Sequence, residues 1–61
     1  MKRQDLSTHL RRHGCEILRE GGRHTVYINP INGQKAAVPR HKEIKSTTAR
    51  EIAKALGISL P

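Results

Sequence analysis

Apolar side chains recur at helical spacing near both ends of the chain. In residues 2–13, Leu6 and Leu10 are four positions apart, and no glycine or proline interrupts the segment. Near the other end, four apolar residues at i, i+3, i+4 and i+7 form one continuous helical stripe: Ala49, Ile52, Ala53 and Leu56. The pattern therefore predicts two amphipathic helices that flank the middle of the chain.

Both predicted helices have recognisable ends. Gly14 and Gly57 each follow the last apolar position, where a glycine in the left-handed conformation commonly ends a helix. Serine and threonine precede the second helix, and the pair Thr48 and Glu51 fits a capping box, in which the two side chains satisfy free backbone N–H groups. Ser46, Thr47 and Thr48 are therefore the candidate caps of the second helix.

Between the helices, the sequence has the composition of β-strands separated by turn residues. Three short segments have this character: 15–20, 24–28 and 34–38. Two glycines separate the first pair, an Asn-Gly turn separates the second, and Pro39 ends the third because it cannot donate to a strand ladder. The turns are short, so the strands are expected to form an antiparallel meander.

The element order is α-β-β-β-α, which predicts an α+β fold and a single domain over residues 1–61. Two helices that cover one face of a three-stranded antiparallel sheet are the simplest way to bury both apolar stripes. The other face of the sheet would then be open to a ligand.

The composition is strongly basic. The 61 residues include 12 Lys and Arg against 5 Asp and Glu, a formal net charge of +7 with the 4 histidines neutral. Residues 1–14 hold four basic side chains against one acidic (+3), and residues 40–45 hold three against one (+2). Such runs are either solvated surface or sites that neutralise phosphates. Tyr27 is the one aromatic residue, so recognition of RNA backbone and shape fits better than base stacking.

Several classes of protein are excluded by what the chain lacks. No apolar run approaches the ~20 residues that span a bilayer, and no apolar stretch follows the basic start as in a secretory signal. The single cysteine, Cys15, forms no internal disulfide and is interpreted as a small buried apolar residue. Gly-rich phosphate loops, cysteine-pair zinc spacings and paired carboxylates are missing. We expect a cytoplasmic protein without a cofactor, a membrane partner or a small-molecule substrate.

Two of the four histidines are spaced i, i+4 on the first predicted helix. His9 and His13 could form a zinc pair that Cys15 or another histidine completes. This spacing alone specifies no tetrahedral site, so exposed polar helix residues are the preferred interpretation.

His24 has a different setting, because it follows two glycines and Arg23. A glycine turn admits a phosphate backbone, Arg23 supplies fixed charge, and imidazole titrates near neutral pH. These are the ingredients for general acid–base attack by a ribose 2′-OH without a metal. Alternation leaves a second interpretation open. His24 shares a face with Val26 and Ile28, and if that face packs on the helices, His24 is only a residue at the core margin.

Five motifs follow one another over essentially the whole chain. They are Leu6-x-x-x-Leu10-x-x-x-Gly14, Gly22-Arg23-His24-Thr25-Val26-Tyr27, Asn29-Pro30, Val38-Pro39-Arg40-His41-Lys42-Glu43-Ile44 and Thr48-Ala49-Arg50-Glu51-Ile52-x-x-x-Leu56-Gly57-Ile58. No single motif is very specific, but the ordered set resembles the HicA (YcfA-like) family of toxins from toxin–antitoxin systems.

The resemblance implies a fold like that of a double-stranded-RNA-binding domain. It also implies the toxin of a type II toxin–antitoxin system: an mRNA endoribonuclease that needs no ribosome, inhibits translation and is neutralised by a HicB-type antitoxin. His24 stands at the position of the family's catalytic histidine. Arg23 stands where a small polar residue is commoner, a difference that either strengthens RNA binding or disturbs the histidine.

The RNA-binding residues that we expect are Arg23, Arg40, His41, Lys42 and Lys45, and no metal ligand is expected. Two other function classes stay open. One is a non-catalytic RNA-binding module with the same fold, and the other is a structural protein whose charge complements an acidic partner.

Overall fold

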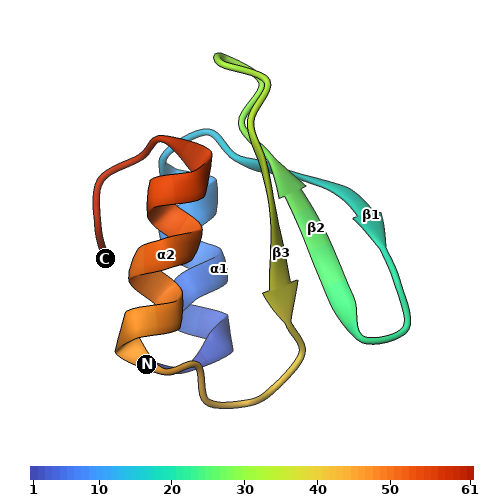
Figure 1. Cartoon of the computed structure of the whole chain (residues 1–61), viewed down its shortest axis with the longest axis vertical. Coiled ribbons are helices and arrows are strands. Elements are labelled where there is room, and N and C mark those ends of the chain that lie inside the picture. Colours follow the sequence, from blue (N-terminus) through green and yellow to red (C-terminus); the bar gives the residue numbers. More distant parts are fainter.

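Five elements form in the order that the sequence predicts. The computed structural model describes residues 1–61, with elements α1 (Arg3–Arg12), β1 (Glu16–Glu20), β2 (His24–Ile28), β3 (Lys35–Pro39) and α2 (Ser46–Leu56). The strands pair antiparallel in the order β1-β2-β3, and the two helices lie side by side with α2 next to β3 (Figure 1). The predicted α+β fold is confirmed. Neither helix combines the length and the apolar character needed to cross a membrane.

The core lies between the two helices and one face of the sheet. Leu6 and Leu10 of α1 and Leu56 of α2 are each 0% exposed, as their helical spacing predicts. Tyr27 of β2 is also buried, and its hydroxyl donates to Ser7 Oγ at 3.2 Å. The remaining members of the cluster are Cys15, Val38, Ile44, Ala49 and Ile52. Full burial of one leucine stabilises a fold by roughly 1.5–3 kcal/mol, so this small set accounts for much of the stability.

The face of β2 that meets the helices is the one without His24. Thr25 and Tyr27 are buried, whereas His24 is exposed and Val26 and Ile28 are only partly covered. Because side chains alternate across a strand, His24 lies on the open face of the sheet. The face of β2 that carries His24 does not pack on the helices, so His24 is not a residue at the margin of the core.

The hairpin formed by β1 and β2 reaches away from the helices (Figure 1). All five residues of β1 are exposed, and Ile17 and Leu18 retain 42% and 48% of their accessible surface. The register shifts between Ile17 and Arg19, which is a β-bulge that adds one residue to the edge strand. The projecting hairpin carries the turn before His24 to the periphery of the molecule.

The C-terminal end of α2 is fixed by a glycine and two asparagines. Gly57 has a φ of 70°, and the N–H of Ile58 donates to the Ala53 carbonyl at 3.0 Å, as the sequence predicts for a glycine cap. Asn29 and Asn32 donate through Nδ2 to the Leu56 carbonyl at 2.9 and 3.1 Å. These two bonds tie the β2–β3 loop to α2 and satisfy a carbonyl that the helix leaves free.

Replacement of Gly57 by alanine should lower the free energy of unfolding by about 1–2 kcal/mol, the strain of an L-residue in the left-handed region. The added Cβ would also lie 2.6 Å from Asn32 Nδ2. Gly22→Ala is the matched control, because φ there is not positive and nothing lies within 4 Å of the added Cβ. Urea unfolding followed by circular dichroism compares the two, and equal stabilities would contradict this explanation.

The expected capping box is wrong. Helix α2 begins at Ser46, its N-cap residue is Lys45, and no side chain caps it. The chain is instead held just before the helix, where Met1 and Ile44 exchange two hydrogen bonds of 2.7 and 3.1 Å. This long-range backbone contact, rather than a capping side chain, holds the chain in place just before α2 begins. Thr48 therefore lies inside the helix.

Candidate nucleic-acid interface

The segments that carry most of the charge meet at one end of the molecule. His24 at the start of β2 pairs with Pro39 at the end of β3, so the β1–β2 turn and residues 40–45 lie at the same end of the sheet. Both helices also begin there (Figure 1). The N–H of Arg3 donates to the Lys42 carbonyl at 2.9 Å, and an isolated bridge joins Lys2 to Glu43. Two stretches far apart in the sequence are thus joined in space.

We call this region the basic end. It holds six of the 12 basic side chains, all on exposed residues: Lys2, Arg3, Arg23, Arg40, Lys42 and Lys45. Of the acidic residues there, Glu20 and Glu43 each form an ion pair, and Asp5 lies in the first turn of α1. The two helix N-termini add partial positive charge at the same end. The arrangement concentrates positive potential where a polyanion would be attracted.

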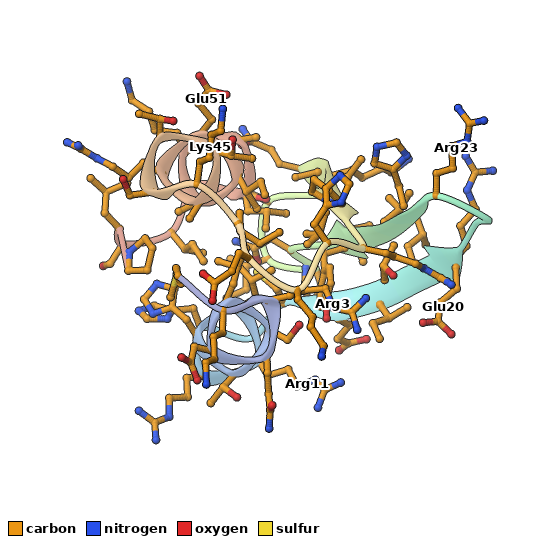
Figure 2. The ribbon with its side chains drawn as sticks, turned by 90° about the horizontal axis from the view of Figure 1, so that it is seen from below. Arg3, Arg11, Glu20, Arg23, Lys45 and Glu51 are labelled. Atoms are coloured by element: carbon orange, nitrogen blue, oxygen red, sulfur yellow. The ribbon has the colours of Figure 1, made fainter.

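His24 stands at the base of the β1–β2 turn. The N–H of Gly21 donates to the His24 carbonyl at 2.8 Å, which closes the turn. A side chain at Gly22 would meet nothing within 4 Å, so the outside of the turn is open to an approaching ligand. Only His9 and His13 use their ring nitrogens in hydrogen bonds, so both ring nitrogens of His24 are free. Arg23 projects from the tip of the hairpin (Figure 2).

Arg40 lies on the other side of the sheet from His24. Its guanidinium is 3.7 Å from Glu20 Oε1, and it lines a groove of about 550 Å³ between α1 and the hairpin. Arg3 and Arg11 of α1 line the same groove. Figure 2 shows Arg3, Arg11 and Glu20 on one side of the molecule and Arg23 on the opposite side. The expected RNA-binding residues therefore gather at one end but not on one face.

The other expected residues lie between these two sides. Lys42 lines a cleft of about 420 Å³ together with Lys2 and Arg3. Lys45 is at the start of α2 (Figure 2), and His41 is exposed in the same connecting segment. Lys2 and Arg3 were not singled out as binding residues by sequence reasoning. The sequence shows that both lie in a basic stretch. That this stretch adjoins Lys42 is seen only from its backbone hydrogen bonds to residues 42–44.

The remaining histidines have structural partners. His9 Nε2 is 2.8 Å from the Ser59 carbonyl, and His13 Nδ1 is 3.0 Å from the His9 carbonyl. No group of three or more His, Cys, Asp and Glu side chains could hold a metal ion. Cys15 is 3% exposed, and burial raises the pKa of its thiol, which disfavours the nucleophilic thiolate. Its interpretation as a buried apolar residue is confirmed.

Comparison with known proteins gives one match. A family model described as the HicA toxin of bacterial toxin–antitoxin systems matches residues 3–58. No curated protein and no solved structure matched the chain. The matched range includes both helices, all three strands and every expected site residue. The chain therefore belongs to the HicA family of bacterial toxins.

Proposed function

We propose that this toxin is an endoribonuclease that cleaves mRNA without a ribosome or a metal ion and thereby inhibits translation. One observation carries the proposal: His24 is exposed at the basic end, with both ring nitrogens free, beside Arg23. An imidazole with both ring nitrogens free can accept or donate a proton, as acid–base catalysis of RNA cleavage requires. Membership of a toxin family supports the same function.

The proposed reaction is an intramolecular transesterification. His24, as general base, takes the proton of a ribose 2′-OH while the 2′-oxygen attacks the adjacent phosphorus. Alternatively, as general acid, it donates a proton to the departing 5′-oxygen. In both cases the P–O5′ bond breaks and the products are a 2′,3′-cyclic phosphate and a 5′-hydroxyl. A guanidinium such as that of Arg23 would stabilise the negative charge that develops on the phosphoryl oxygens.

In this proposal the RNA backbone is held by Arg23, Arg40, His41, Lys42 and Lys45. Lys2 and Arg3 extend this set, because they line the same cleft as Lys42. An RNA strand that crosses the basic end would pass from the groove beside Arg40 to the open face that carries His24. Each phosphate that a basic residue contacts releases counterions, so binding should weaken as salt is added.

Replacement of Lys42 by glutamine should reduce the slope of log affinity against log salt by about 0.7, the value for one phosphate contact with a single strand. Lys54→Gln is the control, because Lys54 lies in the last turn of α2, at the opposite end. Both changes are made in a His24→Ala background, so that the RNA stays intact. Fluorescence anisotropy over a salt series measures the slopes. Identical slopes for the two variants would remove Lys42 from the interface.

The partner that we propose for the silenced toxin is an acidic antitoxin of the HicB type. A negatively charged surface laid over the basic end would neutralise its charge and exclude RNA. The support for this partner is the charge of the basic end together with the toxin family.

A second candidate function is RNA binding without cleavage. It is favoured by one feature of the site, since no side chain hydrogen-bonds to His24 to orient its ring. Incubation of purified protein with RNA in EDTA separates the two functions. Cleavage supports the nuclease, whereas salt-dependent binding with intact RNA and no growth inhibition supports the binding module.

A further inference from the structure

A second groove starts at His24 and runs between the edge strand β3 and helix α2. Its volume is about 290 Å³, and His24 and Pro39 lie at the end where β2 begins and β3 ends. Four α2 residues line the opposite wall: Thr48, Glu51, Ile52 and Ala55. Their spacing of i, i+3, i+4 and i+7 places them on one face of the helix. Glu51 lies on the side of the molecule away from Arg3, Arg11 and Glu20 (Figure 2).

The groove differs in chemistry from the rest of the basic end. Alanines of β3, Pro39 and Ile52 make its walls largely apolar, and no lysine or arginine lines it. Its polar groups are the Thr48 hydroxyl and the Glu51 carboxylate, besides the imidazole of His24. The two ion pairs of the molecule do not involve Glu51, so its carboxylate pairs with neither Arg50 nor Lys54. A phosphate would be repelled here, whereas a flat, mostly apolar group with a hydrogen-bond donor on its edge would be accepted.

A nucleobase is such a group. We propose that this groove binds the base of the nucleotide whose 2′-OH attacks the phosphorus, and that Glu51 selects bases that carry an amino group on their pairing edge. The inference rests on the proposed ribonuclease function, because it is His24 that brings the ribose to the mouth of the groove. Single-stranded RNA is commonly recognised in this way, through unstacked bases whose pairing edges meet protein side chains.

Cytosine and uracil give the sharpest comparison, since they have the same size and differ at the pairing edge. The 4-amino group of cytosine donates to a carboxylate, which is the pairing that acidic residues make with this base. Uracil presents a carbonyl oxygen at that position, and this oxygen would face the Glu51 carboxylate without a proton between them. Glutamine at position 51 would serve both bases, because its amide both accepts and donates.

The test uses chimeric oligonucleotides with a single cleavable ribonucleotide, rC or rU, in an otherwise 2′-deoxy strand. The single 2′-OH fixes the site of attack, so kcat/KM for the two substrates reports the base in question. We expect the wild-type protein to prefer rC about tenfold, near the lower end of the discrimination that one base contact provides. Glu51→Gln should bring the ratio of the two rates close to one while cleavage of rC continues.

Glu16→Gln is the matched control. Glu16 lies on β1, at the opposite edge of the sheet from β3, and its replacement changes the net charge by the same amount. This control should keep the wild-type preference. Equal cleavage of rC and rU by the wild type, or an unchanged preference in Glu51→Gln, would overturn the inference and leave the nuclease standing. Cleavage of neither the chimeras nor an all-RNA strand would overturn the nuclease and the inference together.

Discussion

Alanine in place of His24 should slow RNA cleavage in EDTA by about 10²–10⁴-fold, the contribution of a positioned general acid or base. The imidazole is exposed and no side chain depends on it, so its removal should leave the fold and its stability unchanged. RNA affinity should change little, because the charge of the basic end is intact. The expected loss is therefore in the chemical step and not in binding.

The matched control for this prediction is His13→Ala. His13 is also exposed but lies at the C-terminal end of α1, away from the basic end. A fluorescent RNA strand measures cleavage, and circular dichroism confirms that both variants fold. In cells, the wild type and His13→Ala should inhibit growth on expression, whereas His24→Ala should not. Cleavage by His24→Ala at the wild-type rate would remove this histidine from the mechanism.

Replacement of Leu10 by alanine should destabilise the fold by about 2–5 kcal/mol, as large-to-small changes at fully buried sites do. Leu10 is 0% exposed and belongs to the buried core cluster. A domain of this size has a total stability of roughly 3–9 kcal/mol at 0.05–0.15 kcal/mol per residue. The variant should therefore be largely unfolded, or close to it, at 37 °C.

Leu18→Ala is the control for Leu10→Ala. It makes the same truncation at an exposed position, so the comparison separates the loss of core packing from the effect of replacing a leucine. Leu18 lies in β1 and is 48% exposed, so the same truncation there should cost less than about 1 kcal/mol. Urea unfolding of both variants at 25 °C gives the two differences in stability. A destabilisation by Leu18→Ala as large as that by Leu10→Ala would show that the core extends under the hairpin.

The fold was predictable from the sequence because its local signals agree with one another. Leucines at helical spacing, glycines after the last apolar positions and short turns between β-branched segments all favour one arrangement, and the buried cluster is the one they imply. Pro39 is a small exception. It is the last residue of β3 rather than the first residue after it, since a proline is tolerated at the end of an edge strand.

The features that sequence reasoning missed are tertiary. Asn29 and Asn32 hydrogen-bond to the Leu56 carbonyl across more than 20 residues of sequence, and local turn chemistry does not reveal this. The start of α2 follows a segment held by Met1 and Ile44 and not a capping side chain. Both contacts depend on where α2 sits relative to the loops, which only the packed structure decides.

The candidate site was predictable in part. The sequence identifies His24 and the two basic stretches, and the structure joins those stretches at one end. The sequence does not reveal that Arg40 and His24 lie on opposite sides of the sheet, because this depends on which face of β2 the helices cover. The groove beside His24 was also missed. Thr48 and Glu51 fit a local capping motif in the sequence, whereas in the structure both lie inside α2, on the helix face that lines this groove.

The central claim is that His24 drives attack by the ribose 2′-OH on the adjacent phosphate. Its most direct test is the chemical identity of the new RNA ends, determined by mass spectrometry after cleavage by the purified protein in EDTA. The mechanism predicts a 2′,3′-cyclic phosphate on one fragment and a 5′-hydroxyl on the other. A 3′-hydroxyl and a 5′-phosphate would contradict it, because those ends arise when water, rather than the 2′-OH, attacks the phosphorus.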